Sequence, residues 1–260
     1  MLANAQEVIK YRELLWSWVV RDIKVRYKQS VLGIAWAILQ PLSATLLFAV
    51  VFSYFVPIDT AGIPYPIFYY SAMLPWTFLS SSVSLGVPVL VNNMNLVTKI
   101  YFPREILPIA AVAASFVDFL VASVVFIGMM IFYQVSVGWS ILLVPLVMAI
   151  QVLLTLGIVL AASAMMIRYR DIRFVVPLGL QLWLYATPIN YPLSLVPERF
   201  RTVYMLNPMA GIIDAYRTTI LKAEFPQVEY LLLACAVSVT LFFIAYWYFK
   251  RAEMEFADII

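Results

Sequence analysis

The 260-residue chain contains no histidine and a single cysteine, Cys235. Without histidine, the chain lacks the commonest general base and the commonest transition-metal ligand, so we expect no metal site. A lone cysteine can form neither an internal disulfide nor a cysteine-rich metal site. The eight glycines include no Gly-x-x-x-x-Gly-Lys-Ser/Thr motif, which is a common phosphate-binding loop of ATPases. We therefore expect no catalytic residue and no bound cofactor in this chain.

Charged residues are also scarce. They make up 12% of the chain, whereas hydrophobic residues make up 64% and the mean hydropathy is +0.94. A soluble domain carries about 25% charged and about 45–50% apolar residues, so most of this surface must face lipid. The net charge of +3 is too small to indicate nucleic-acid binding. The composition predicts an all-α membrane protein.

Runs of about 20 mostly apolar residues mark the expected membrane helices. Six spans follow, at residues 31–56, 66–91, 106–134, 141–167, 173–191 and 229–249. With six spans, the segments that share one side of the membrane hold 13 of the 17 Lys and Arg residues; these segments are 1–30, 92–105, 168–173 and 250–260. The positive-inside bias makes that side cytoplasmic, so we expect both termini in the cytoplasm.

Residues 1–30 precede the transmembrane domain at 31–260 and have the pattern of a basic amphipathic helix. Its apolar face would carry Val8, Tyr11, Leu15, Trp18 and Val19. Such a helix lies in the headgroup region of a membrane, where Trp16 and Trp18 would act as anchors. The alternative is a soluble cap helix that packs against something else.

The long external segment 192–227 precedes the last span. Asn207 and Pro208 have the pattern of an N-cap and a first helical residue. Apolar residues then recur at helical spacing, on the face opposite Asp214 and Arg217; these residues are Met209, Ile212, Ile213, Tyr216 and Ile220. The helix is too short and too charged to span, so we expect a re-entrant gate helix sheltered by protein. An ordinary external loop helix is the alternative.

Asp118 is the one acid deep in an expected span. Ionisable groups inside a membrane usually indicate function. A proton relay would need further titratable partners, and the other spans offer none in their interiors. We therefore favour a structural hydrogen bond from Asp118 to a neighbouring helix.

Aromatic residues form 15% of the chain. Interfacial belts of Trp and Tyr occur in any membrane protein and explain many of them. A column of rings could instead line a conduit and stack on sugar faces. The candidates for such a conduit are Phe48, Phe52, Trp76, Phe78, Trp183, Tyr185 and Tyr191.

Several strings together resemble the permeases of ABC-2 type exporters. The segment from Arg26 to Gly33, with Trp36 and Leu39-Gln40-Pro41, resembles the entry to the first span of that family. The string from Asn95 to Pro108 resembles its first cytoplasmic loop, and Asn207-Pro208-Met209 with Arg217 resembles its external segment. Its fifth-span signature resembles Arg170-Asp171-Ile172 with Leu182, Thr187-Pro188-Ile189 and Tyr191. The likeness covers nearly the whole chain in order. It is strongest to the branch that exports O-antigen (lipopolysaccharide), capsule and teichoic acid.

The resemblance implies a homodimer in the bacterial inner membrane, with two copies of a separate ABC ATPase that binds ATP and magnesium. The substrate would be a lipid-linked polysaccharide. The residues implied to receive the motion of the ATPase are Asn95, Lys99, Phe102, Pro103, Arg104, Glu105, Arg170 and Asp171. The implied cytoplasmic entrance comprises Arg26, Tyr27, Ser30, Leu32 and Gly33. The implied external gate comprises Asn207, Pro208 and Arg217.

Three alternatives remain open. The chain could be a permease for a drug or another small hydrophobic substrate. It could be a membrane glycosyl or acyl transferase, although it offers few of the acids that such an enzyme needs. It could also be a scaffold for envelope assembly.

Overall fold

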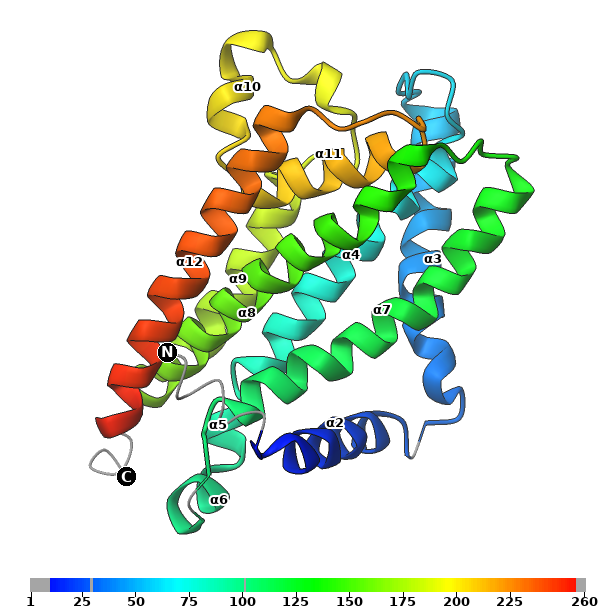
Figure 1. Ribbon diagram of the computed structural model, residues 1–260. Coiled ribbons are helices and arrows are strands. Elements are labelled where there is room, and N and C mark those ends of the chain that lie inside the picture. Colours follow the sequence, from blue (N-terminus) through cyan, green and yellow to red (C-terminus); the bar gives the residue numbers. More distant parts are fainter. Residues whose placement is uncertain (1–9, 29, 101, 256–260) are drawn as a thin grey trace.

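In the computed structural model, residues 10–28, 30–100 and 102–255 are described, and they contain helices and no strand (Figure 1). Helices account for 79% of the residues. The all-α prediction is therefore confirmed.

Within the described ranges, four helical segments are long and apolar enough to cross a membrane: Gly33–Phe55, Ile106–Phe132, Trp139–Arg168 and Val228–Met254. They contain the helices α3 (Trp36–Val50), α7 (Ile106–Phe132), α8 (Val144–Arg168) and α12 (Val228–Glu255). Their composition and length confirm the membrane-protein class. The count of six spans and the side on which the termini lie stay predictions.

The other two expected spans correspond to α4 (Tyr65–Gly86) and α9 (Ile172–Tyr185). Fifteen of the 22 residues of α4 are buried in the protein, so this helix can be less apolar than a helix that faces lipid. It ends at Gly86, short of the expected 91, and α5 (Val89–Asn92) begins after Pro88. α9 has only 14 residues, a rise of about 21 Å, which is shorter than a typical span.

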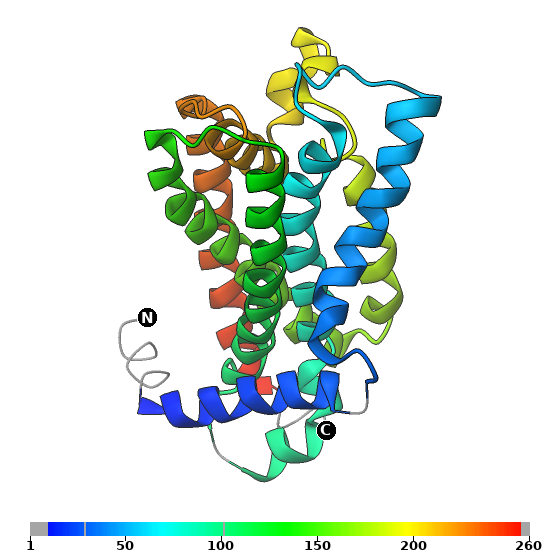
Figure 2. The same cartoon turned by 90° about the vertical axis from the view of Figure 1, so that its right-hand side faces the viewer.

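The short helices lie at the two ends of the bundle (Figures 1 and 2). At one end, α2 (Arg12–Tyr27) lies across the long helices, and α6 (Met94–Lys99) projects beyond it. At the opposite end lie α10 (Glu198–Tyr204) and α11 (Pro208–Ile220). We call these the α6 end and the α11 end.

α8 and α12 approach each other closely at Gly157. A Cβ atom at this position would lie 2.4 Å from Leu241 Cδ2 and 3.0 Å from Phe242 Cα. Glycine is therefore required for this approach, as small residues are at many membrane-helix crossings. The pairing brings the last turns of α8 and α12 to the α6 end together (Figure 1).

The apolar face of α2 packs on the protein. Trp18 is 7% exposed and Val19 is 3% exposed, whereas Trp16 is 67% exposed. The prediction that Trp18 anchors the helix in lipid is therefore wrong, because the bundle covers its ring. Val8 lies outside the described residues. The placement of α2 in the headgroup region stays a prediction.

Candidate functional site

The residues expected to receive the motion of an ATPase lie at the α6 end, and they fall into an exposed group and a buried group. Asn95 and Lys99 are exposed on α6, and Arg170 and Asp171 are exposed on the neighbouring loop between α8 and α9. By contrast, Phe102 is 6% exposed and Glu105 is fully buried, and Pro103 between them is buried as well. The exposed group can contact a partner, whereas the buried group can only transmit movement within the chain.

Phe102 belongs to an apolar cluster that joins α2, α5, α6, α7, α8 and α12. Its other members include Trp18 of α2, Val97 of α6, Ile106 of α7 and Phe249 of α12. Interiors of this kind are close-packed, so a displaced ring moves its neighbours. α6 is therefore in packing contact, through this cluster, with α2 and α12.

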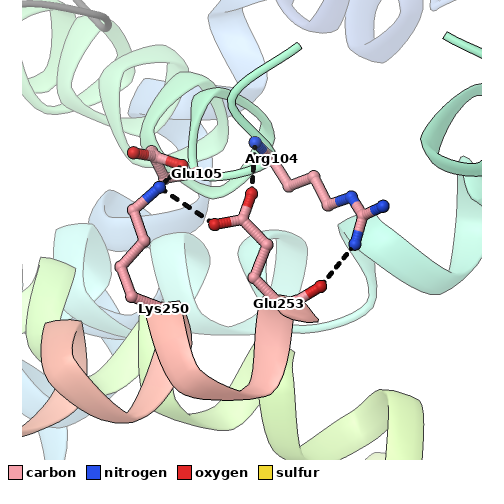
Figure 3. Close-up of polar contacts among 4 residues, drawn as sticks. All are labelled: Arg104, Glu105, Lys250 and Glu253. Atoms are coloured by element: carbon pink, nitrogen blue, oxygen red, sulfur yellow. Dashed lines mark hydrogen bonds and ion pairs between the residues drawn. The ribbon is translucent and has the colours of Figure 1, made fainter. Parts of the chain in front are cut away.

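Polar contacts connect Arg104 and Glu105, in the loop before α7, to the last turns of α12 (Figure 3). Lys250 Nζ donates to Glu105 Oε2 at 2.6 Å and to Glu253 Oε2 at 2.9 Å. The backbone amide of Arg104 donates to Glu253 Oε1 at 3.2 Å, and Arg104 Nη1 donates to the Glu253 carbonyl at 2.6 Å. Because Glu105 is fully buried, its charge depends on Lys250 for a partner.

Lys250 and Glu253 were not among the predicted site residues. A Lys and a Glu three residues apart at the end of an apolar helix give a weak signal, because such pairs are common on solvated helix ends. Their partners lie about 145 positions earlier in the chain, and only the fold brings the two segments together.

Asp118 pairs with α2 rather than with a neighbouring long helix. Its carboxylate forms an ion pair with Arg26 and accepts a hydrogen bond from the Tyr27 hydroxyl at 2.8 Å. Burial lowers the pKa of Arg26 and raises that of Tyr27, and in each case the other side chain partly opposes the shift. The expected structural bond is therefore present. Its donors come from the predicted entrance segment.

A cavity of about 440 Å³ lies beside this ion pair, between α2, α3, α4 and α7. Hydroxyl groups and aromatic rings share its wall with the two charged residues. The polar and aromatic lining includes Arg26, Tyr27, Trp36, Gln40, Thr77, Phe78, Ser80, Ser81, Ser84, Ser115, Asp118 and Phe119. Such a wall can donate and accept hydrogen bonds and present ring faces to a polar ligand.

The other predicted entrance residues form the turn between α2 and α3. The Ser30 hydroxyl accepts a hydrogen bond from the Gly33 amide at 3.1 Å. Gly33 has a φ of +53°, a left-handed conformation that disfavours other residues. Leu32 is 48% exposed. The structure thus brings Arg26 and Tyr27 into the cavity wall and leaves Ser30, Leu32 and Gly33 in the turn beside it.

At the α11 end, Asn207 caps α11 as predicted. Its Oδ1 accepts a hydrogen bond from the Met209 amide at 3.1 Å, and Pro208 is the first helical residue. The same oxygen accepts from Trp183 Nε1 at 2.8 Å, and the Asn207 amide group donates to Thr187 Oγ1 at 2.9 Å. One residue therefore begins α11 and attaches it to α9.

Arg217 was expected on the polar face of α11, and this prediction is wrong because the side chain is 6% exposed. Its Nη1 donates to the carbonyls of Pro188 at 2.5 Å and Tyr191 at 3.3 Å. Its Nη2 donates to those of Ile189 at 2.7 Å and Phe68 at 3.3 Å. Four carbonyls thus bind the two terminal nitrogens of the guanidinium, whereas its buried Nε has no hydrogen-bond partner. The guanidinium carbon also lies 3.6 Å from the centre of the Phe68 ring. Burial lowers the pKa of Arg217, and the nearby Asp214 opposes that shift.

The seven conduit candidates occupy different environments. Phe48 and Phe52 are half-buried and stack on one another, and they continue onto Tyr69 and Tyr65 of α4. Trp76 and Phe78 are each 3% exposed. Trp183 packs edge-on against Trp76, Tyr185 is 60% exposed, and the hydroxyls of Tyr191 and Tyr204 are 3.0 Å apart. Only some of these rings could therefore face a conduit without rearrangement.

Comparison with known proteins gives consistent matches along the chain. Residues 13–221 match the family described as ABC-2 type transporter. A Myxococcus xanthus protein named O-antigen export system permease protein RfbA is 32% identical over 263 aligned residues, which cover 100% of both chains. A Klebsiella pneumoniae protein of the same name is 27% identical over 92% of each chain. An Escherichia coli protein named polysialic acid transport protein KpsM is 24% identical over 90% of this chain and 92% of its own.

The ion pair between Arg26 and Asp118 should hold α2 on the bundle. In Arg26→Gln and in Asp118→Asn, we expect amide hydrogen exchange in α2 to accelerate about tenfold, because the remaining charge is left half-buried without its partner. The double variant should exchange no faster than either single variant, since the two residues act as a pair. Mass spectrometry of deuterated peptides measures these rates. Lys24→Gln, an exposed change on the same helix, is the control, and additive effects would contradict the pairing.

Arg217 should be essential for the stability of the α11 end. In Arg217→Lys the ammonium cannot reach four carbonyls in one plane, so about 2–3 kcal/mol of stability should be lost. The apparent melting temperature of the detergent-purified protein should then fall by about 5–10 °C. Arg199→Lys changes an exposed arginine at the same end and should leave the melting temperature unaltered. Equal melting temperatures for the two variants would show that a guanidinium group is not required at position 217.

Proposed function

This chain belongs to the ABC-2 type transporter family, and we propose that it is the membrane subunit of an ATP-driven exporter of lipid-linked polysaccharide. The observation that carries the proposal is the full-length similarity, at 32% identity, to a relative named as an O-antigen export permease. The chain has no phosphate-binding loop, so ATP and magnesium would bind a separate ATPase subunit. Two copies of each subunit would form the exporter in the bacterial inner membrane.

In this proposal the α6 end faces the cytoplasm, and both termini lie there. The distribution of Lys and Arg supports this orientation. The ATPase would contact the exposed side chains Asn95 and Lys99 of α6 and the neighbouring Arg170 and Asp171. Phe102 and Glu105 are buried and would not be contacted. They would carry the movement inward.

The buried residues offer two routes for that movement. The Phe102 ring packs in the same cluster as Trp18, so a push on α6 shifts α2. The contacts of Glu105 with Lys250 and of Arg104 with Glu253 shift the end of α12 at the same time. Because α2 also carries Arg26, its movement would alter the ion pair with Asp118 beside the cavity.

The cavity supports a role in receiving the polar part of the substrate. A sugar offers hydroxyls for hydrogen bonds and apolar ring faces for stacking, and this wall supplies serine and threonine hydroxyls together with Trp36, Phe78 and Phe119. The exposed Leu32 in the adjacent turn gives a lipid tail an apolar surface at the membrane boundary. A lipid-linked sugar has both parts, whereas a purely hydrophobic drug would leave the hydroxyls unpaired.

The exposed faces of α3 and α9 support a second copy of the chain. None of the residues of α9 is buried, and Gln181 is exposed on it. Gln40 and Ser43 are exposed on α3. Amide and hydroxyl groups are costly against lipid, and they are better accommodated at a helix interface or along a polar conduit. The half-buried rings of Phe48 on α3 and of Phe52 in the π-helical segment that follows it, Val51–Phe55, would line that conduit.

The experiment that tests the proposal is affinity purification of the tagged chain from its native membranes, combined with deletion of its gene. An ABC ATPase should co-purify in equal amount, and the deletion strain should accumulate lipid-linked polysaccharide in the cytoplasmic leaflet. Recovery of the chain alone, with transferase activity on a lipid-linked sugar, would reject the exporter in favour of a membrane enzyme. Normal export in the deletion strain would also reject it.

Lys250 should couple ATP hydrolysis to export. Lys250→Met leaves Glu105 buried without its cation, and Glu105→Gln with Lys250→Met removes both charges and the connection with them. In the double variant we expect export to fall about tenfold, a loss of about 1.4 kcal/mol in coupling, while ATP hydrolysis by the purified complex stays within about twofold.

Lys10→Met, a change at an exposed residue just before α2, is the control and should export normally. A double variant that folds and exports at the normal rate would remove α12 from the proposed route. A parallel fall in hydrolysis and export would instead indicate a loss of the complex, which the co-purification assay detects.

A further inference from the structure

An apolar groove of about 750 Å³ runs along the outer side of α8 and α12. Its wall includes Ala161 and Met165 of α8 and Ala236, Thr240 and Trp247 of α12. The small alanine side chains leave the space between the two helices, and the lining is almost entirely apolar. In Figure 1 α12 and α3 lie at opposite sides of the bundle, so the groove is separate from the cavity beside Asp118.

The length of the groove corresponds to one leaflet. From Ala236 to Trp247 the rise along α12 is about 16 Å. The hydrocarbon core of a bilayer is about 30 Å thick, so one leaflet contributes about 15 Å. The groove therefore matches the depth that one acyl chain occupies in the leaflet at the α6 end.

Two arginines lie at the α6 end of the groove. Arg168 is one helical turn beyond Met165 on α8, and Arg251 is one turn beyond Trp247 on α12. Both are exposed, and the Arg251 guanidinium lies 5.8 Å from the centre of the Trp247 ring. The acid nearest to Arg251 along α12 is Glu253, which binds Lys250 and Arg104. Positive charge thus stands where the phosphate of a lipid in the groove would lie.

We propose that this groove binds an anionic phospholipid, with one acyl chain between α8 and α12 and the phosphate at Arg168 and Arg251. The proposal rests on the proposed function for the membrane position of the α6 end. Basic residues at the ends of helix grooves recognise anionic headgroups in this way, whereas a zwitterionic lipid gains less from the two cations. The bound lipid would stabilise the turn of α12 that holds Glu105 and Arg104.

The test is native mass spectrometry of the delipidated, detergent-purified complex, titrated separately with phosphatidylglycerol and phosphatidylcholine. The first phosphatidylglycerol should bind roughly thirtyfold more tightly, because each arginine near the surface contributes about 1 kcal/mol. Arg168→Gln with Arg251→Gln should abolish the preference, and Ala236→Phe should weaken both lipids by filling the groove. Arg199→Gln at the α11 end and Leu232→Phe, outside the groove on α12, are the matched controls and should change neither affinity.

Four outcomes would overturn the proposal. Equal affinities for the two lipids would overturn it, and so would a preference that survives in the double arginine variant. Stronger competition by a polyprenyl phosphate than by phosphatidylglycerol would assign the groove to the substrate carrier, and loss of subunit association in Ala236→Phe would assign it to a protein contact. Lipid binding is measured on the purified complex, so a negative result leaves the exporter assignment untouched, and a failed export assay leaves the lipid result valid.

Discussion

A charge buried away from water must find a partner, and in this chain the partners lie far apart in the sequence. Glu105 depends on Lys250, Asp118 depends on Arg26, and Arg217 depends on four backbone carbonyls. Each contact joins a short segment at one end of the bundle to a long helix or loop that sets its position. The helices could pack in many ways on apolar contacts alone, whereas few arrangements satisfy all three charges. Charge pairing therefore fixes α2, α11 and the loop before α7.

The two ends of the bundle are attached by different chemistry. At the α6 end the contacts join side chains of opposite charge, and these can separate and re-form when α2 or α12 moves. At the α11 end one guanidinium binds carbonyls in a fixed plane, an arrangement that tolerates little displacement. The α6 end is therefore suited to transmit movement, whereas α11 is suited to move as a rigid unit, if at all.

Local chemistry could be predicted from the sequence, and distant partners could not. Mostly apolar runs located the long helices because lipid forces an apolar composition, and Asn207-Pro208 located the start of α11 because capping involves neighbouring residues. Arg217 was assigned to the polar face from its residue type alone, since the carbonyls that satisfy it have no sequence signature. The spacing of apolar residues around Trp18 does not distinguish lipid from protein as the apolar neighbour, and the sequence therefore predicted a lipid anchor. The link from Glu105 to Lys250 spans 145 residues and needs the fold.

The burial of Phe102, Pro103 and Glu105 has a mechanical consequence. If Phe102 and Glu105 lay on the surface, α6 could rock without moving anything else. Because Phe102 fills a close-packed cluster and Glu105 would lose its cation by leaving Lys250, α6 cannot move far alone. In the proposed function, a displacement of Asn95 or Lys99 would therefore be shared with α2 and α12. Since α2 holds Asp118 through Arg26, a push at the surface of α6 would also alter the wall of the cavity.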